Sequence, residues 1–173
     1  MAFKKVALTV ALLAGISGVS LNANADAQAT ITLEGVITNT TCDVEVNGGQ
    51  ATLFVGVYKS SDFEVNKQLG SVPMPVSLTN CTGAETGKLV VQGLTATGDT
   101  QNQIFVDDVT NTVGFMIKDA NGTQASNLDG PELEIADGET SAKYIFEVGM
   151  GSTTTSPTAD AYSAPILVAY VTE

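Results

Sequence analysis

The sequence contains no histidine, no tryptophan and no arginine, and its only basic residues are seven lysines. Without an imidazole base, the usual Ser–His–Asp and Cys–His catalytic arrangements are absent. Nineteen acidic residues give a net charge of −12 at pH 7, and so acidic a surface repels nucleic acid and anionic lipid. Calcium-loop and phosphate-loop motifs are also missing. We therefore predict no enzyme activity, no cofactor, no metal and no nucleic-acid partner.

Helical periodicity is equally absent, because no segment keeps apolar residues at a spacing near 3.6. Apolar residues instead alternate with polar ones in short segments, and turn signals such as Asn121-Gly122 separate these segments about every 8 to 14 residues. This pattern predicts a single all-β sandwich. The expected strands span residues 51–58, 72–78, 88–94, 104–109, 113–117, 142–150 and 164–171.

Two prolines limit where one of these strands can lie in its sheet. Pro73 and Pro75 stand two positions apart in the segment 72–78, so both missing amide hydrogens face the same side of the strand. We expect this strand to lie at a sheet edge or at a crossing point rather than in the middle of a sheet.

The first 25 residues are typical of a secretory signal peptide. Lys4 and Lys5 precede an apolar run over residues 6–19, and Ala23-Asn24-Ala25 fits the small-x-small cleavage pattern. The alternative, a membrane anchor, is disfavoured because the run falls short of the ~20 residues that a bilayer requires. We expect export and a mature chain that begins at Asp26.

Cys42 and Cys81 are the only cysteines. In an exported chain an even pair is most simply one disulfide. The alternative is a metal site, which without histidine would need carboxylates to complete its ligand shell.

The segment that follows the signal peptide alternates with a period of two. One face carries Gln28, Thr30, Thr32 and Glu34; the opposite, apolar face carries Ala27, Ala29, Ile31 and Leu33. This is the pattern of a β-strand with one buried face. No turn residue before Gly35 folds residues 26–34 back on themselves, so this arm must pair with some sheet to satisfy its backbone.

The last expected strand, residues 164–171, is apolar on both faces. Ile166, Val168 and Tyr170 share one face, and the residues between them form the other. Either this strand is central and covered by loops, or a partner chain covers it or pairs with it. The sequence leaves both possibilities open.

Taken in order, these features resemble the pilin subunits of bacterial chaperone–usher fimbriae, in particular the type 1-like shaft pilins. The resemblance rests on the arm Ile31–Gly35, on Cys42, on the segment 76–81 that ends in the second cysteine, on residues 113–122, and on the closing segment 159–170 with its tyrosine. It spans nearly the whole mature chain. Ala29 stands where the family usually has glycine, and three residues follow Tyr170 where the family tyrosine is next to the chain end.

The resemblance implies an immunoglobulin-like sandwich over residues 35–173 that lacks its final strand and is completed by donor-strand exchange. In such proteins a periplasmic chaperone fills the groove first, and the arm of the next subunit replaces it after passage through the outer-membrane usher. It also implies that the groove and chaperone contact involve Ile37, Ile166, Val168 and Tyr170. The implied function is that of a structural fimbrial subunit at the cell surface, which supports adhesion.

Two other functions remain open. The chain could be a single-domain fimbrial adhesin, or a tip or adaptor subunit that binds a host receptor through loops such as residues 95–103 or 151–160. It could also be a plain secreted immunoglobulin-like module whose arm pairs with its own domain.

Overall fold

The structure is a computed structural model that describes residues 42–172. The expected signal peptide and arm, residues 1–34, lie outside the described residues, and those expectations stay predictions. The described part is all-β, with strands β1 (Asp43–Val46), β2 (Leu69–Thr79), β3 (Glu85–Thr95), β4 (Phe105–Val106), β5 (Val113–Lys118), β6 (Glu132–Ile135), β7 (Ala142–Ser152) and β8 (Ile166–Thr172).

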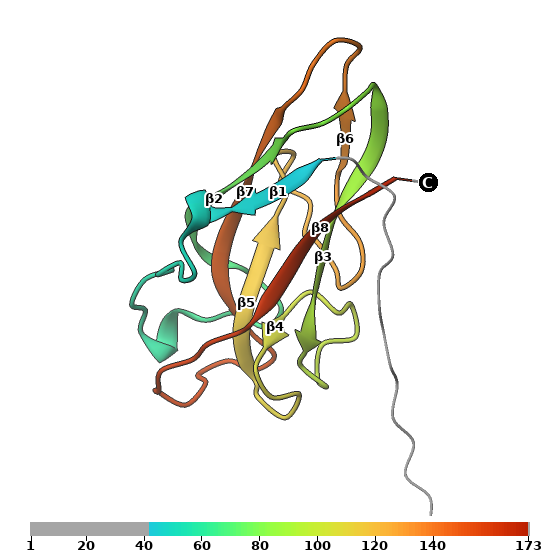
Figure 1. Ribbon diagram of the computed structural model, residues 1–173. Helices are drawn as coiled ribbons and strands as arrows, with labels where there is room; N and C mark the ends of the chain where they lie inside the picture. The colour runs from blue at the N-terminus through green and yellow to red at the C-terminus, as the bar shows by residue number, and fades with distance from the viewer. Residues whose placement is uncertain (1–41, 173) are drawn as a thin grey trace, which may run out of the picture. The chain divides into compact units, whose positions relative to one another are not determined.

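Two layers of antiparallel strands form the sandwich (Figure 1). One layer has the order β1–β2–β7–β5, and in the other β3 pairs with both β6 and β8. The two-residue strand β4 joins the layers, because it pairs with β5 on one side and with the end of β3 on the other. The strands thus form a nearly closed antiparallel sheet, as the all-β prediction required.

Helix is confined, within residues 42–172, to two single 3₁₀ turns, η1 (Asn47–Gly49) and η2 (Ser60–Asp62). In this same part of the chain, no helix has the length and hydrophobicity needed to cross a bilayer.

The core lies between the layers and is built by the inward positions of the alternating strands. Phe146 and Val148 of β7 are buried, and Met74, Val76 and Leu78 of β2 point the same way. Side chains from the remaining strands complete the core, and large, fully buried ones among them are Phe105, Leu89, Ile117, Ile135 and Tyr170. The alternation of apolar residues in the segments 72–78 and 142–150 predicts these inward faces, and the structure confirms them.

The two prolines lie in a strand that has a partner on both sides, but only over part of its length. The ladder with β7 runs through Pro73 and Pro75, whereas β1 pairs only with residues 76–79 of β2. The prolines therefore stand beyond the end of β1, where no strand within the described residues pairs with the far side of β2. The expectation of a sheet edge is correct locally and wrong for the strand as a whole.

The segment 51–58 corrects one prediction. It was expected to be a strand with Ala51, Leu53, Val55 and Val57 on one buried face, yet it contains no assigned strand. Val55 is buried and Leu53 is half-buried against the core, but Val57 is 88% exposed. The reason is Gly56, whose φ of +133° changes the direction of the chain and turns Val57 away from the core.

Candidate strand-acceptor groove

Strand β8 forms one wall of the candidate site, because within residues 42–172 it has a strand partner on one side only. Its ladder with β3 runs from Ile166 opposite Gly93 to Thr172 opposite Gly87. Among the strands of residues 42–172, β3 is the only one that pairs with β8. The other edge of β8 has no strand partner in this part of the chain.

The direction of the backbone groups along this edge follows from the hydrogen bonds of β3. The amides of Leu89 and Val91 donate to the carbonyl oxygens of Pro131 and Asp129, on the side of β3 away from β8. Since hydrogen-bonded and non-bonded pairs alternate in an antiparallel ladder, the even-numbered residues of β3 bond to β8. The backbone groups of Ile166 and Val168, opposite odd-numbered residues, therefore point away from β3.

The second wall is formed by β1 and the segment that follows it. Among the described strands, β1 pairs with β2 alone, and it lies beside β8 with no ladder between the two strands. After β1, residues 51–58 run on without a strand partner in the described chain. The nearly closed sheet thus has one unsealed seam, between β8 on one side and residues 43–58 on the other.

The lining of this seam is apolar. The two walls contribute five hydrophobic residues that pack against the core without being fully buried: Val44, Val46, Leu53, Ala164 and Ile166. Between the two walls, core side chains close the bottom of the seam, since Val55 and Val168 are only 6% and 8% exposed. A half-buried apolar edge of this kind favours the addition of a strand that brings its own apolar side chains.

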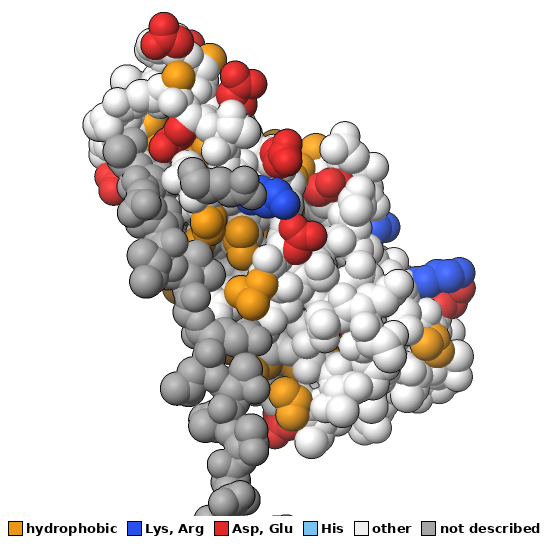
Figure 2. Space-filling model, turned by 90° about the vertical axis from the view of Figure 1, so that its right-hand side faces the viewer, with side chains coloured by type: hydrophobic (Ala, Val, Ile, Leu, Met, Phe, Trp, Pro, Cys, Tyr) orange, Lys and Arg blue, Asp and Glu red, His pale blue; other side chains and the backbone are white. Residues whose placement is uncertain are grey.

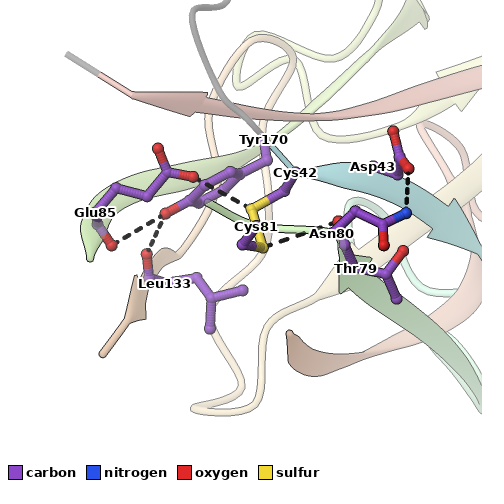
Figure 3. The surroundings of a disulfide bond; sticks show 8 residues. All are labelled: Cys42, Asp43, Thr79, Asn80, Cys81, Glu85, Leu133 and Tyr170. Atoms are coloured by element: carbon purple, nitrogen blue, oxygen red, sulfur yellow. Dashed lines mark hydrogen bonds between the residues drawn. A yellow bond between two sulfur atoms is a disulfide. The ribbon is translucent and has the colours of Figure 1, made fainter. Parts of the chain in front are cut away.

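Tyr170 fixes the far end of β8. Its ring is 1% exposed and packs over Gly87, where a Cβ atom would stand 2.8 Å from the ring. Its hydroxyl donates a hydrogen bond to the carbonyl oxygen of Leu133 at 3.0 Å, and the carbonyl oxygen of Glu85 lies 3.4 Å away (Figure 3). Tyr170 therefore ties β8 to both β3 and β6.

The same surroundings disfavour the tyrosinate form. Burial raises the pKa of Tyr170 above its ordinary value, and the negative charge of Glu85 raises the pKa further. The neutral hydroxyl that donates to Leu133 is thus the form that the folded protein stabilises.

The disulfide Cys42–Cys81 lies beside this anchor (Figure 3). Cys42 immediately precedes β1 and Cys81 follows β2 closely, with their Cα atoms 4.1 Å apart. Next to it, the side-chain amide of Asn80 donates to a carboxylate oxygen of Asp43 at 2.7 Å. The predicted disulfide is confirmed, and the alternative of a metal bound by the two cysteines is excluded. Within residues 42–172, no cluster of three or more potential metal ligands occurs.

The outer face of β8 lies on the side of the strand opposite the groove. Leu167 is 57% exposed there, and Leu94 on the neighbouring strand β3 is 51% exposed. Figure 2 shows hydrophobic side chains gathered toward the middle of the side that carries β3 and β6. The loop cover considered for this face does not extend over Leu167, and among the strands of residues 42–172 β8 lies at an edge, paired with β3 alone.

The structure brings together the predicted groove residues that it describes. Ile166, Val168 and Tyr170 lie on one face of β8 and point to the core. Ile37 and the arm residues Ala27, Ala29, Ile31 and Leu33 fall outside the described residues, so their roles stay predictions.

Sequence reasoning missed the second wall, although the alternation of residues 51–55 already placed Leu53 and Val55 on one face. It also missed the carbonyl partners of Tyr170, for which the sequence carries no signal, since any residue supplies a carbonyl.

Pilus proteins are among the solved structures that this chain resembles. A subunit in a structure of a chaperone–usher pilus, solved to explain rod uncoiling, matches with a TM-score of 0.57 at 15% identity, over 86% of this chain and 97% of the other. The chain has the pilin fold. The P pilus rod subunit PapA matches equally well, with a TM-score of 0.57 at 15% identity, over 75% of this chain and 99% of PapA.

A third match is an antigen and type I fimbria protein of Burkholderia pseudomallei, with a TM-score of 0.51 at 19% identity, over 76% of this chain and 94% of that protein. No protein-family model and no curated protein matches the sequence. At identities this low, the structural matches establish a shared fold alone. That pilin fold is an immunoglobulin-like sandwich without its final strand, which agrees with the unsealed seam described above.

Proposed function

We propose that this protein is a structural subunit of a bacterial surface fimbria, and that it polymerises by inserting the arm 26–34 of one copy into the groove of the next. It then acts by assembly and not by catalysis. The observation that carries the proposal concerns the described residues 42–172: there β8 pairs with no strand except β3, and across an apolar seam it faces β1 and residues 51–58.

The chemistry of the arm suits this seam. Its alternation supplies backbone groups for the β8 edge and an apolar face, including Ile31 and Leu33, for the half-buried lining. Burying each of these two side chains contributes about 1.5–3 kcal/mol. Dissociation would return both the arm and the lining to water, so a fibre held this way needs no covalent link between subunits.

The proposed route follows from the same features. The expected signal peptide directs export to the periplasm, where a chaperone that occupies the groove would keep the exposed apolar edge from pairing at random. An outer-membrane usher would then pass subunits to the cell surface. The structural likeness to pilus rod subunits supports assembly with identical or related pilins as the partners.

Substitution on the two faces of the arm tests the proposal. We expect Ile31→Asp, introduced on the chromosome, to abolish incorporation of the chain into sheared surface fibres, because an ionised carboxylate cannot enter an apolar groove without a large desolvation penalty. Thr32→Asp is the matched control: it places the same charge on the polar face and should leave incorporation nearly unchanged. Immunoblots of fibre and periplasmic fractions measure both.

The acceptor side is tested in the same way. Ile166→Asp, on the groove face of β8, should block incorporation, whereas Leu167→Asp on the exposed outer face should not. Normal amounts of fibre from both the arm variant Ile31→Asp and the groove variant Ile166→Asp would refute strand insertion.

A further inference from the structure

The turn that follows β5 is a tight, exposed loop held from within. Asp119 organises it: one carboxylate oxygen accepts hydrogen bonds from the backbone amides of Asn121, at 2.9 Å, and of Thr123, at 2.7 Å. The amide of Gly122 donates to the carbonyl oxygen of Asp119 at 3.0 Å, and the amide of Asp119 donates to the carbonyl oxygen of Thr123 at 2.9 Å. These bonds leave Asn121, Gly122 and Thr123 exposed at the tip.

Asn121-Gly122-Thr123 is also an acceptor sequence for N-linked glycans, Asn-x-Thr with a residue other than proline between. The sequence has three such tripeptides, and the first, at Asn39, lies outside the described residues. The other two differ in their geometry. The carboxamide of Asn121 makes no hydrogen bond to any described residue, whereas the carboxamide nitrogen of Asn80 donates to Asp43 at 2.7 Å and its neighbour Cys81 is buried in the disulfide.

An open hollow adjoins the Asn121 turn. It has a volume of about 430 Å³ and lies on the outer surface of the β2–β7–β5 layer, away from the core. Ile145, 52% exposed, contributes an apolar patch, and Gln68, Ser71, Lys118 and Glu147 surround it with polar groups. Hydroxyl groups of a sugar match such polar groups, and the C–H face of a sugar ring matches an exposed aliphatic side chain. The hollow is within the size range of small-ligand sites.

We infer that Asn121 is an N-glycan acceptor and that the first sugars of the glycan lie in this hollow. Glycan transfer needs a glycosyl diphospholipid and a membrane-bound transferase as co-reactants, and the proposed export route would have to supply both. The carboxamide nitrogen of Asn121 attacks the anomeric carbon of the sugar. The new C–N bond replaces the C–O bond to the diphosphate, the lipid diphosphate leaves, and a base of the transferase takes the amide proton. A glycan here would lie on the outer side of the layer opposite β8 and would leave the groove open.

Co-expression tests this inference with the full chain. The chain is exported in a laboratory strain that has no N-glycosylation of its own but is supplied with a bacterial oligosaccharyltransferase and its lipid-linked oligosaccharide. A copy of residues 119–123, appended through a flexible Gly/Ser linker, serves as the internal positive control. Intact mass and peptide sequencing then locate each glycan. We expect the mass of one glycan at Asn121 and none at Asn80.

Two variants at one position sharpen the result. Thr123→Ala removes the acceptor sequence but keeps the backbone bond to Asp119, and should abolish modification at Asn121. Thr123→Ser retains the acceptor sequence and should restore it. A chain modified at the appended copy but not at Asn121, or modified at Asn80 in preference to Asn121, would overturn the inference.

The position of the glycan is tested on the modified protein. If the first sugars occupy the hollow, the amide resonances of Ser71 and Glu147 should shift on glycosylation, although both residues are far from Asn121 in sequence. Shifts confined to residues 119–123 would overturn this second part and leave the acceptor role intact.

Discussion

The anchoring of β8 by Tyr170 gives a prediction in which stability depends on pH. Tyr170→Phe keeps the buried ring and removes only the hydroxyl that donates to Leu133 at 3.0 Å. One net hydrogen bond contributes about 0.5–1.5 kcal/mol, and a carbonyl left without a partner adds to the cost. At pH 7 we therefore expect the variant to be less stable by roughly 1–2 kcal/mol.

The sign of the pH effect follows from the raised pKa of Tyr170 in the folded protein. Below the ordinary tyrosine value of about 10, the hydroxyl is protonated in both the folded and the unfolded states and its full contribution is present. Above about pH 10 the unfolded chain loses this proton more readily, so the contribution is lost as the pH rises through the folded-state pKa. The stability gap between wild type and Tyr170→Phe should shrink there, by at most about 1.4 kcal/mol per pH unit.

Urea unfolding of the purified full chain, followed by circular dichroism at pH 7 and across pH 9–11, measures this gap. The variant keeps the chain's other tyrosines, so the difference between the two proteins isolates Tyr170. A gap that stays constant from pH 7 to pH 11 would show that the environment of Tyr170 does not favour its neutral form, and that reasoning would fail.

Other predictions concern the loops and the disulfide. Asp99 is 4% exposed and accepts a hydrogen bond from the buried amide of Ile104 at 2.6 Å, so Asp99→Ala should cost about 2–4 kcal/mol in urea unfolding, and a loss below 0.5 kcal/mol would contradict this. Gly130→Ala would place a Cβ atom 1.8 Å from the carbonyl oxygen of Leu89 and should lower the melting temperature clearly, whereas Gly83→Ala, which meets nothing within 4 Å, should not. Reduction of the disulfide, which spans 39 residues, should cost about 4 kcal/mol, measured as the shift of the urea midpoint with and without reductant.

Much of the fold could be predicted because alternation with a period of two reports directly which face a strand buries. It identified the inward sides of β2 and β7, and the Asn121-Gly122 turn appears where expected, with Gln124 and Lys118 bridged across it. The disulfide followed from the count of cysteines alone. These features depend on neighbours in sequence or on a single pair of residues, so a local reading suffices.

What the sequence did not reveal depends on contacts between distant segments. Residues 51–58 alternate like a strand but have no assigned pairing partner among the described residues. Gly56 breaks the alternation through its positive φ angle, which the pattern of residue types does not predict. Residues 104–109 were expected to form a strand, but only Phe105 and Val106 do so: both pair with β3, and Phe105 also pairs with β5. The carbonyl oxygens that hold the Tyr170 hydroxyl could not be predicted for the same reason, because they belong to distant segments.

The position of the disulfide has a mechanical consequence for a fibre of the proposed kind. A pull on the chain ahead of Cys42 reaches the described strands at the end of β1 where Asp43 faces Thr79. Without a covalent link, that load would peel β1 from β2 one rung at a time, starting at this end. The Cys42–Cys81 bridge carries the pull straight to the end of β2 and thus into the longest ladder among the described strands, that of β2 with β7, where many residue pairs share the force.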